Sequence, residues 1–185
     1  MISFGAKYIN SVNIQKINRS NDLIEPCEVY CVELDPASDE DIDAMVSVSE
    51  NWDSYWKFSE LISNCMKYYS KYKDKLEGNK FYAITTQKEY LHHLEPSEVL
   101  AVSQIYKNDN DIKLKYLEVK PDDIELIKKP YVFNHIGSGM LNALKNIFSD
   151  KRIKLFSSSD AATRFYKANG FKESENVRSE MYYEA

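Results

Sequence analysis

The stretch Ile112-Lys113-Leu114-Lys115-Tyr116-Leu117-Glu118-Val119-Lys120-Pro121 carries the most information about the fold. Up to Tyr116 its apolar residues stand at alternate positions, which is typical of a β-strand, and from Leu117 the alternation continues in the other phase. A change of phase within a strand indicates a β-bulge, although an unbroken strand with Leu117 packed on a second helix layer would give the same pattern. We expect the bulge, which would free backbone groups to pair with an extended ligand.

A helix start follows at His135-Ile136-Gly137-Ser138-Gly139-Met140-Leu141. Small residues at such a position leave several backbone N–H groups unpaired at the positive end of the helix dipole, which suits a pyrophosphate. The glycines would also let the backbone approach a ligand closely. Glycine at a helix start is more often a simple turn residue, so this stretch is informative only together with its surroundings.

The other elements are indicated by strand-forming runs, helix caps and turn residues. Their order is one strand, two helices, three strands, a helix, a strand, a helix and two strands. This order predicts a mixed α/β sheet in which antiparallel strands come first and a parallel crossover follows. The expected strands are 28–35, 80–86, 99–106, 112–119, 151–156, one from 171 and 179–183, and the expected helices start near 38, 54, 137 and 159.

The length and composition fit one globular domain, with 185 residues of which 43% are hydrophobic. We divide the chain into an N-terminal extension or arm, residues 1–26, and a single domain, residues 27–185. The net charge is −5, and Lys and Arg are interspersed with acids, which argues against a nucleic-acid partner. The acidic balance either favours a cationic substrate such as an amine or serves only solubility.

The three cysteines, Cys27, Cys31 and Cys65, are odd in number and have no metal-ligand spacing, so we expect neither a disulfide framework nor a metal site. The first residues lack a basic segment followed by an apolar run, and no stretch approaches the length of a membrane span. We therefore expect a cytoplasmic protein without a membrane partner.

Two motifs resemble the GCN5-related N-acetyltransferase (GNAT) superfamily. Leu117-Glu118-Val119-Lys120-Pro121 is similar to the end of its bulged strand, and residues 136–141 are similar to the glycine turn that enters its long helix. Ala162-Thr163-Arg164-Phe165-Tyr166-Lys167-Ala168-Asn169-Gly170-Phe171 is similar to its later motif, an aromatic-Tyr pair, three residues and Gly-Phe. The resemblance covers about residues 28–183. It implies a GNAT-like α/β (α+β) fold, a mixed, mostly antiparallel central sheet flanked by about four helices, with a β-bulge in the fourth strand.

The resemblance also implies acetyl-CoA as a co-substrate and no metal. The glycine turn of the family reads Arg or Gln, two residues, Gly, one residue, then Gly or Ala, and it fits here in two registers. In one, Asn134 takes the Arg/Gln place; in the other, Val132 takes that place and His135 the first glycine. Ser159 stands where the family often has Asn. The implied cofactor contacts are Leu117, Val119, Asn134, His135, Ile136, Gly137, Ser138, Gly139 and Ser159.

For the reaction, the resemblance implies transfer of an acetyl group to an amine of a small molecule or protein. A backbone N–H at Leu117 or Val119 would donate to the developing oxyanion, and Tyr166 would protonate the leaving thiolate. From the residues alone, Tyr166 would instead be a core aromatic of its helix. Glu118 is the candidate base, with Tyr106 and chains of water molecules as alternatives.

Two further hypotheses remain. The chain could be a catalytically inactive CoA-binding or protein-interaction module, which the altered residue before the glycine turn favours. It could also be a structural interaction protein that uses the N-terminal arm and the Tyr-rich helix, and a homodimer stays open as an assembly.

Overall fold

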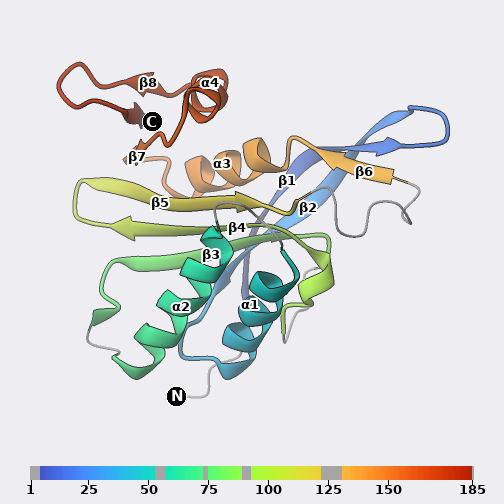
Figure 1. Cartoon of the computed structure of the whole chain (residues 1–185), viewed down its shortest axis with the longest axis horizontal. Helices are drawn as coiled ribbons and strands as arrows, with labels where there is room; N and C mark the ends of the chain where they lie inside the picture. The colour runs from blue at the N-terminus through green and yellow to red at the C-terminus, as the bar shows by residue number, and fades with distance from the viewer. Residues whose placement is uncertain (1–4, 53–56, 73–74, 89–92, 122–130, 185) are drawn as a thin grey trace.

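The structure is a computed structural model that describes residues 5–52, 57–72, 75–88, 93–121 and 131–184. Over these residues, nine strands form one sheet in the order β6-β1-β2-β3-β4-β5-β7-β9-β8, in which only β5 and β7 run parallel (Figure 1). The predicted mixed, mostly antiparallel sheet is therefore confirmed. Its strands are β1 Lys7–Asn18, β2 Ile24–Leu34, β3 Asn79–Thr85, β4 Val99–Lys107, β5 Asp111–Val119, β6 Tyr131–Asn134, β7 Arg152–Phe156, β8 Lys172–Glu173 and β9 Glu180–Tyr183. The helices are α1 Asp39–Asn51, α2 Phe58–Lys71, α3 Ile136–Ile147 and α4 Asp160–Ala168, with a short 3-10 turn η2 at Pro96–Glu98.

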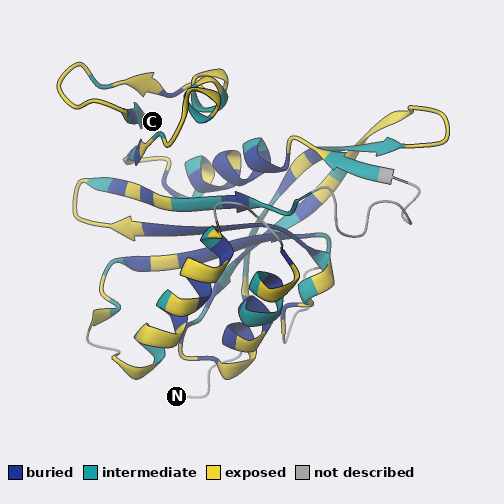
Figure 2. Cartoon of the chain, in the orientation of Figure 1, coloured by how far each residue is buried: buried dark blue, intermediate teal, exposed yellow. Residues whose placement is uncertain are grey.

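Helices cover both faces of the central strands, so these strands are buried on each side (Figures 1 and 2). Along β3, Phe81 and Ala83 pack with α1 and α2, whereas Tyr82 and Ile84 pack with α3. This two-sided burial explains why β3 and β4 are almost continuously apolar in sequence, because successive side chains of a strand point to opposite faces. The layers place α3 and α4 on one side of the sheet and α1 and α2 on the other.

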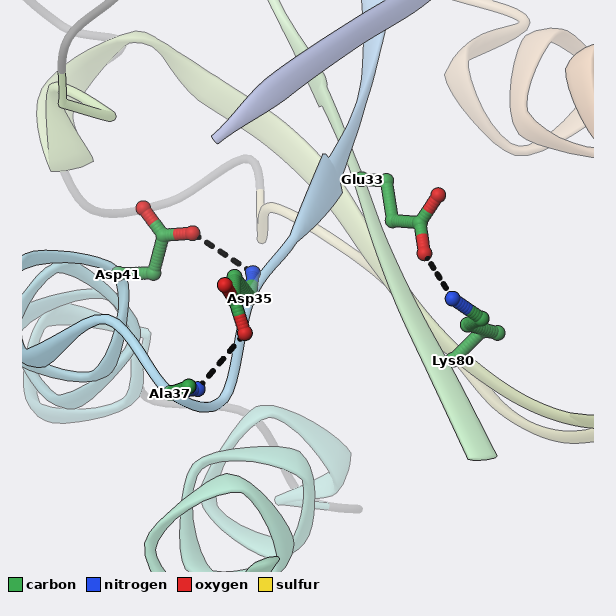
Figure 3. A network of polar contacts seen from close by, with 5 residues as sticks. All are labelled: Glu33, Asp35, Ala37, Asp41 and Lys80. Carbon is green, nitrogen blue, oxygen red and sulfur yellow. Dashed lines mark hydrogen bonds and ion pairs between the residues drawn. The ribbon is translucent and has the colours of Figure 1, made fainter. Parts of the chain in front are cut away.

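The start of α1 follows the sequence prediction. Ser38 caps the helix, and its Oγ accepts a hydrogen bond from the backbone N–H of Asp41 at 3.3 Å. The Asp41 carboxylate is buried and accepts from the backbone N–H of Asp35 at 2.7 Å, while Asp35 accepts from Ala37 and Glu33 pairs with Lys80 (Figure 3). Burial raises the pKa of Asp41 to about 6, against the lowering effect of its backbone hydrogen bonds. The group therefore ties the start of α1 to the end of β2 while carrying a desolvation cost.

The strand β1 lies within the stretch that the sequence suggested as an extension or arm. It pairs along its length with β2, and its residues 15–18 also pair with β6. Val12 and Ile14 are buried in the cluster beneath α3. A Cβ added at Gly139 of α3 would lie 2.8 Å from Cγ2 of Ile14, so the glycine permits a close approach of helix and strand. Residues 7–18 thus belong to the packed sheet and support the first turns of α3.

The β-bulge in β5 is confirmed, and it lies at Lys115. Leu114 pairs with Ile105 and Tyr116 pairs with Gln104, which leaves Lys115 without a counterpart on β4. Before the bulge Ile112 and Leu114 pack toward α3, and after it Leu117 and Val119 pack on the same side. Tyr116 packs with the α1 and α2 cluster, so the sequence pattern placed the change two residues late. β5 is the fourth strand of the predicted order, because β1 was not counted there.

Candidate active site

The sheet separates on one side of β5 at the bulge. β7 pairs with β5 from Asp111–Arg152 to Leu114–Leu155, and the pairing of the two strands ends there. On the other side, β4 stays paired with β5 as far as Val119. The gap leads into a cleft of about 740 Å³ between β5, the start of α3 and α4. This volume is in the range of small-molecule and cofactor sites.

The start of α3 forms one end of this cleft. Ile136, Gly137 and Ser138 line it, and as the first residues of the helix their N–H groups have no acceptor within the helix. The N–H of Gly139 is the first to bond in the helical pattern, and it donates to the carbonyl of His135 at 2.8 Å. The positive end of the α3 dipole therefore faces the cleft, where an anionic group would be stabilised.

Gly137 lies close to the two other walls of the cleft. A Cβ placed there would lie 3.0 Å from Cζ of Phe165 and 3.4 Å from Cγ2 of Val119. The absence of a side chain at Gly137 therefore leaves room beside the backbone of α3, between β5 and α4. The arrangement fits an extended acyl-CoA: apolar strand residues along the arm, and free N–H groups for the diphosphate.

The residue before α3 is in the left-handed conformation, with φ 63° at His135. This conformation costs most residues about 1–2 kcal/mol and is routine for glycine. The backbone therefore favours the register in which His135 takes the first glycine place and Val132 takes the Arg/Gln place. In that register, neither a basic nor an amide side chain occupies the position before the turn.

The helix α4 forms the opposite wall. Ser159 caps its start, with Oγ accepting from the N–H of Ala162 at 3.2 Å, and lines the cleft. Phe165 and Tyr166 come about two turns later and also line it. Burial raises the pKa of Tyr166 to about 12, so its hydroxyl stays protonated throughout the physiological range. The ring is held by edge contacts with Phe165 and Phe171, whose centroids lie 5.1 and 5.6 Å away.

Glu118 points to the other face of β5. Its Oε2 accepts a hydrogen bond from the backbone N–H of Ser59, the second residue of α2, at 2.5 Å. The side chain is only 6% exposed, and for its Oε1 the described residues provide no hydrogen-bond partner. Phe58 stacks on Tyr116 next to this contact, with ring centroids 5.3 Å apart. The start of α2 is thereby held against the strand that carries Leu117.

The structure brings most of the sequence-predicted site residues into one cleft. Two are placed elsewhere: Glu118 lies on the α2 side, and Gly139 faces Ile14. Tyr106, the alternative base, lines a separate pocket near β7. The predicted residues that line the cleft are Leu117, Val119, Asn134, His135, Ile136, Gly137, Ser138, Ser159 and Tyr166.

Sequence reasoning missed several other lining residues. Lys120 and Pro121 end the strand motif, and Ala162 and Phe165 belong to the α4 motif, so these four could have been read from the matched stretches. Ser158 and Ala161 lie just before the α4 motif, next to the predicted contact Ser159. Phe58 and Phe133 come from α2 and β6, outside either motif, and nothing in the local sequence marks them. In the ranges that the structure covers, no three His, Cys, Asp or Glu side chains are grouped to hold a metal ion, and no helix is long and apolar enough to cross a membrane.

The sheet that opens beside a bulged strand, together with a helix start facing the gap, defines the fold of the GCN5-related N-acetyltransferases, and solved structures confirm the resemblance at the level of fold. A GNAT-family protein from Desulfovibrio desulfuricans is similar with 11% identity and a TM-score of 0.53, covering 83% of this chain and 94% of that one. PaiA N-acetyltransferase from Thermoplasma acidophilum, solved with coenzyme A, is similar with 15% identity and a TM-score of 0.50, covering 83% and 96%.

A third similar structure is a mutant of the toxin AtaT, bound to the C-terminus of the antitoxin AtaR and to acetyl-CoA. It shares 10% identity and a TM-score of 0.53, covering 84% of this chain and 92% of that one. No protein-family model and no curated protein matches the chain. At these identities the likeness shows the fold alone.

Proposed function

We propose that the chain is an acetyl-CoA-dependent N-acetyltransferase whose acceptor is an amine of a small molecule or protein. The single observation that carries the proposal is the cleft between β5 and α4, which begins where β5 loses β7 and ends at the unpaired N–H groups of α3. The solved structures with coenzyme A or acetyl-CoA share this fold and support the choice of co-substrate. The absence of a side chain at Gly137, between Phe165 and Val119, leaves room for the pantetheine arm and also supports this choice.

In this proposal the chain positions the acyl donor and moves two protons. Acetyl-CoA supplies the acyl group as a thioester, and the neutral amine forms a C–N bond as the C–S bond breaks. A backbone N–H at Leu117 or Val119 donates to the oxygen on which negative charge develops. Tyr166, kept neutral by burial, donates its proton to the departing sulfur. Solvent then reprotonates the phenol.

The proton released by the amine needs an acceptor, and we assign it to Glu118 acting through water. Glu118 neighbours Leu117 along β5, is buried, and has one carboxylate oxygen fixed by Ser59 while the other has no partner among the described residues. Through the same hydrogen bond, Glu118 also holds the start of α2 in place. Replacement by Gln separates the two roles, because the amide oxygen still accepts from Ser59 whereas the basic oxygen is lost.

The experiment measures CoA release with a panel of amines and peptides, alongside calorimetric titration of acetyl-CoA. We expect turnover in the wild type, a loss of about 100-fold or more in kcat for Tyr166→Phe, and unchanged acetyl-CoA affinity in that variant. Glu118→Gln should lower kcat at neutral pH, because an amide oxygen cannot take up the proton that the amine releases. Unchanged turnover in Tyr166→Phe would remove the acid assignment.

A catalytically inactive CoA-binding module is the second candidate. It is favoured by Val132 at the place where the GNAT superfamily has Arg or Gln, in the register that the left-handed His135 supports. Binding of acetyl-CoA without release of CoA for any amine or peptide of the panel would establish this alternative.

A further inference from the structure

A second pocket, of about 520 Å³, opens on the face of the sheet opposite α3, beside the point where β5 and β7 separate. Its walls come from β4, β5, β7 and β9, beyond the part of the sheet that α2 covers. We call it the lysine pocket, because Lys113, Lys115 and Lys154 line it, together with Tyr106, Phe156 and Glu180. No step of the proposed reaction uses these side chains.

The charges of the lysine pocket are unequal. Lys154 pairs with Asp111 at 2.5 Å, so this cation is neutralised. For Lys113 and Lys115, no ion pair is found within the residues that the structure describes. Both are exposed at the surface, and Lys115 donates a hydrogen bond to the amide oxygen of Asn79 at 3.3 Å. Two ammonium groups therefore face one remaining carboxylate, that of Glu180.

Two rings complete the lysine pocket. The ammonium of Lys113 lies 5.1 Å from the ring centroid of Phe156, and that of Lys115 lies 5.7 Å from the ring centroid of Tyr106. Phe156 is 51% exposed and Tyr106 37%, so both rings are accessible to a ligand. The rings hold the two cations in place by cation–π contact and offer apolar surface to a ligand.

The lysine pocket lies close to the place where the acceptor must react. Lys115 is two residues from Leu117 and Lys113 is four, which corresponds to about 7 and 13 Å along the strand. On the α2 side, the contacting rings of Phe58 and Tyr116 and the hydrogen bond that the Ser59 N–H donates to Glu118 close the approach. If a ligand reaches Leu117 from this face, the part of it away from the reacting nitrogen therefore lies over the lysine pocket.

We propose that the lysine pocket binds a carboxylate carried by the amine acceptor, with the carboxylate about 7–13 Å from the reacting nitrogen. The inference rests on the proposed function and names the substrate class for that site. A single negative charge matches the excess of one cation in the pocket, whereas the −5 net charge of the chain disfavours a polyanion. The acceptor class is thus an amine with one distal carboxylate and an apolar spacer.

The test compares 6-aminohexanoate with hexylamine, which have the same carbon chain and differ in the carboxylate. The wild type should acetylate 6-aminohexanoate with the higher kcat/KM. The double variant Lys113→Gln/Lys115→Gln should lower that preference by about tenfold, mainly through KM, because each partly exposed charge contact contributes a factor of up to about five to binding. Lys67→Gln, on the exposed surface of α2, is the matched control and should retain the wild-type preference.

A wild type that prefers neither amine, or a double variant that keeps the preference, would overturn the inference. If neither amine is acetylated, backbone amide NMR shifts decide, measured with and without CoA. Shifts at Lys113, Lys115 and Phe156 caused by 6-aminohexanoate and absent with hexylamine support the lysine pocket, and their absence rejects it. Failure of the proposed function is recognised separately, because it removes acetyl-CoA binding in calorimetry, which the double variant should leave intact.

Discussion

Replacing Gly137 by valine tests whether the start of α3 is the phosphate-binding end of the cleft. A Cβ there would lie 3.0 Å from Phe165 and 3.4 Å from Val119. In Gly137→Ala, a small shift of the Phe165 ring end accommodates this Cβ. Valine adds two more methyl groups, which must occupy the cleft itself. Valine should therefore remove one backbone hydrogen bond to an anionic ligand, a loss of about 2 kcal/mol. This corresponds to an increase of about thirtyfold in the dissociation constant of acetyl-CoA. Gly137→Ala should stay within about threefold of the wild type.

The control is Gly139→Ala, in the same turn of α3. Its Cβ would lie 2.8 Å from Ile14, a methyl group held in the core, and it does not line the cleft. Overpacking should lower the free energy of unfolding by about 1–2 kcal/mol after the gain in helix propensity, with acetyl-CoA affinity retained. Calorimetry and urea unfolding of the three variants provide the measurements. If Gly137→Val binds acetyl-CoA as the wild type does, the assignment of the α3 start is refuted.

Two further predictions concern the fold. Burial raises the pKa of Asp41 from 3.8 to about 6, so the folded state favours the neutral carboxyl. The stabilisation of the folded state by the neutral form is complete below about pH 3.8 and is lost as the pH rises through about 6. Asp41→Asn should therefore gain stability relative to the wild type by up to about 3 kcal/mol between pH 4 and pH 7 in urea unfolding, whereas a difference independent of pH would contradict the assignment. Ile14 is 3% exposed, and Ile14→Ala should lower the free energy of unfolding by about 2–4 kcal/mol; a loss below about 1 kcal/mol would show that β1 is a detachable arm.

The fold was largely predictable where local pattern and local chemistry agree. Ser38 caps α1 as the run of acidic residues after it indicated, and the helix at Gly137 begins one residue earlier than expected. The bulge was predicted from the change of phase, yet it lies at Lys115. Tyr116 is apolar but packs on Phe58 at the opposite face, so its hydrophobicity said nothing about which face it occupies.

Long-range partners account for what the sequence did not predict. β6 has four residues, too few for periodicity, and becomes a strand because β1 lies beside it. The bond between Glu118 and Ser59 joins positions 59 residues apart, and only the folded chain shows that this carboxylate fixes α2. Gly137 and Gly139 look equivalent in sequence, yet Gly137 lines the cleft, whereas Gly139 permits the close packing of β1 against α3.

Calorimetric titration of the full chain with acetyl-CoA tests the central proposal most directly. The cleft beside β5 predicts one binding site per chain with a dissociation constant in the micromolar range, weakened by Gly137→Val. Absence of binding at high micromolar acetyl-CoA, with the protein folded, would contradict the account.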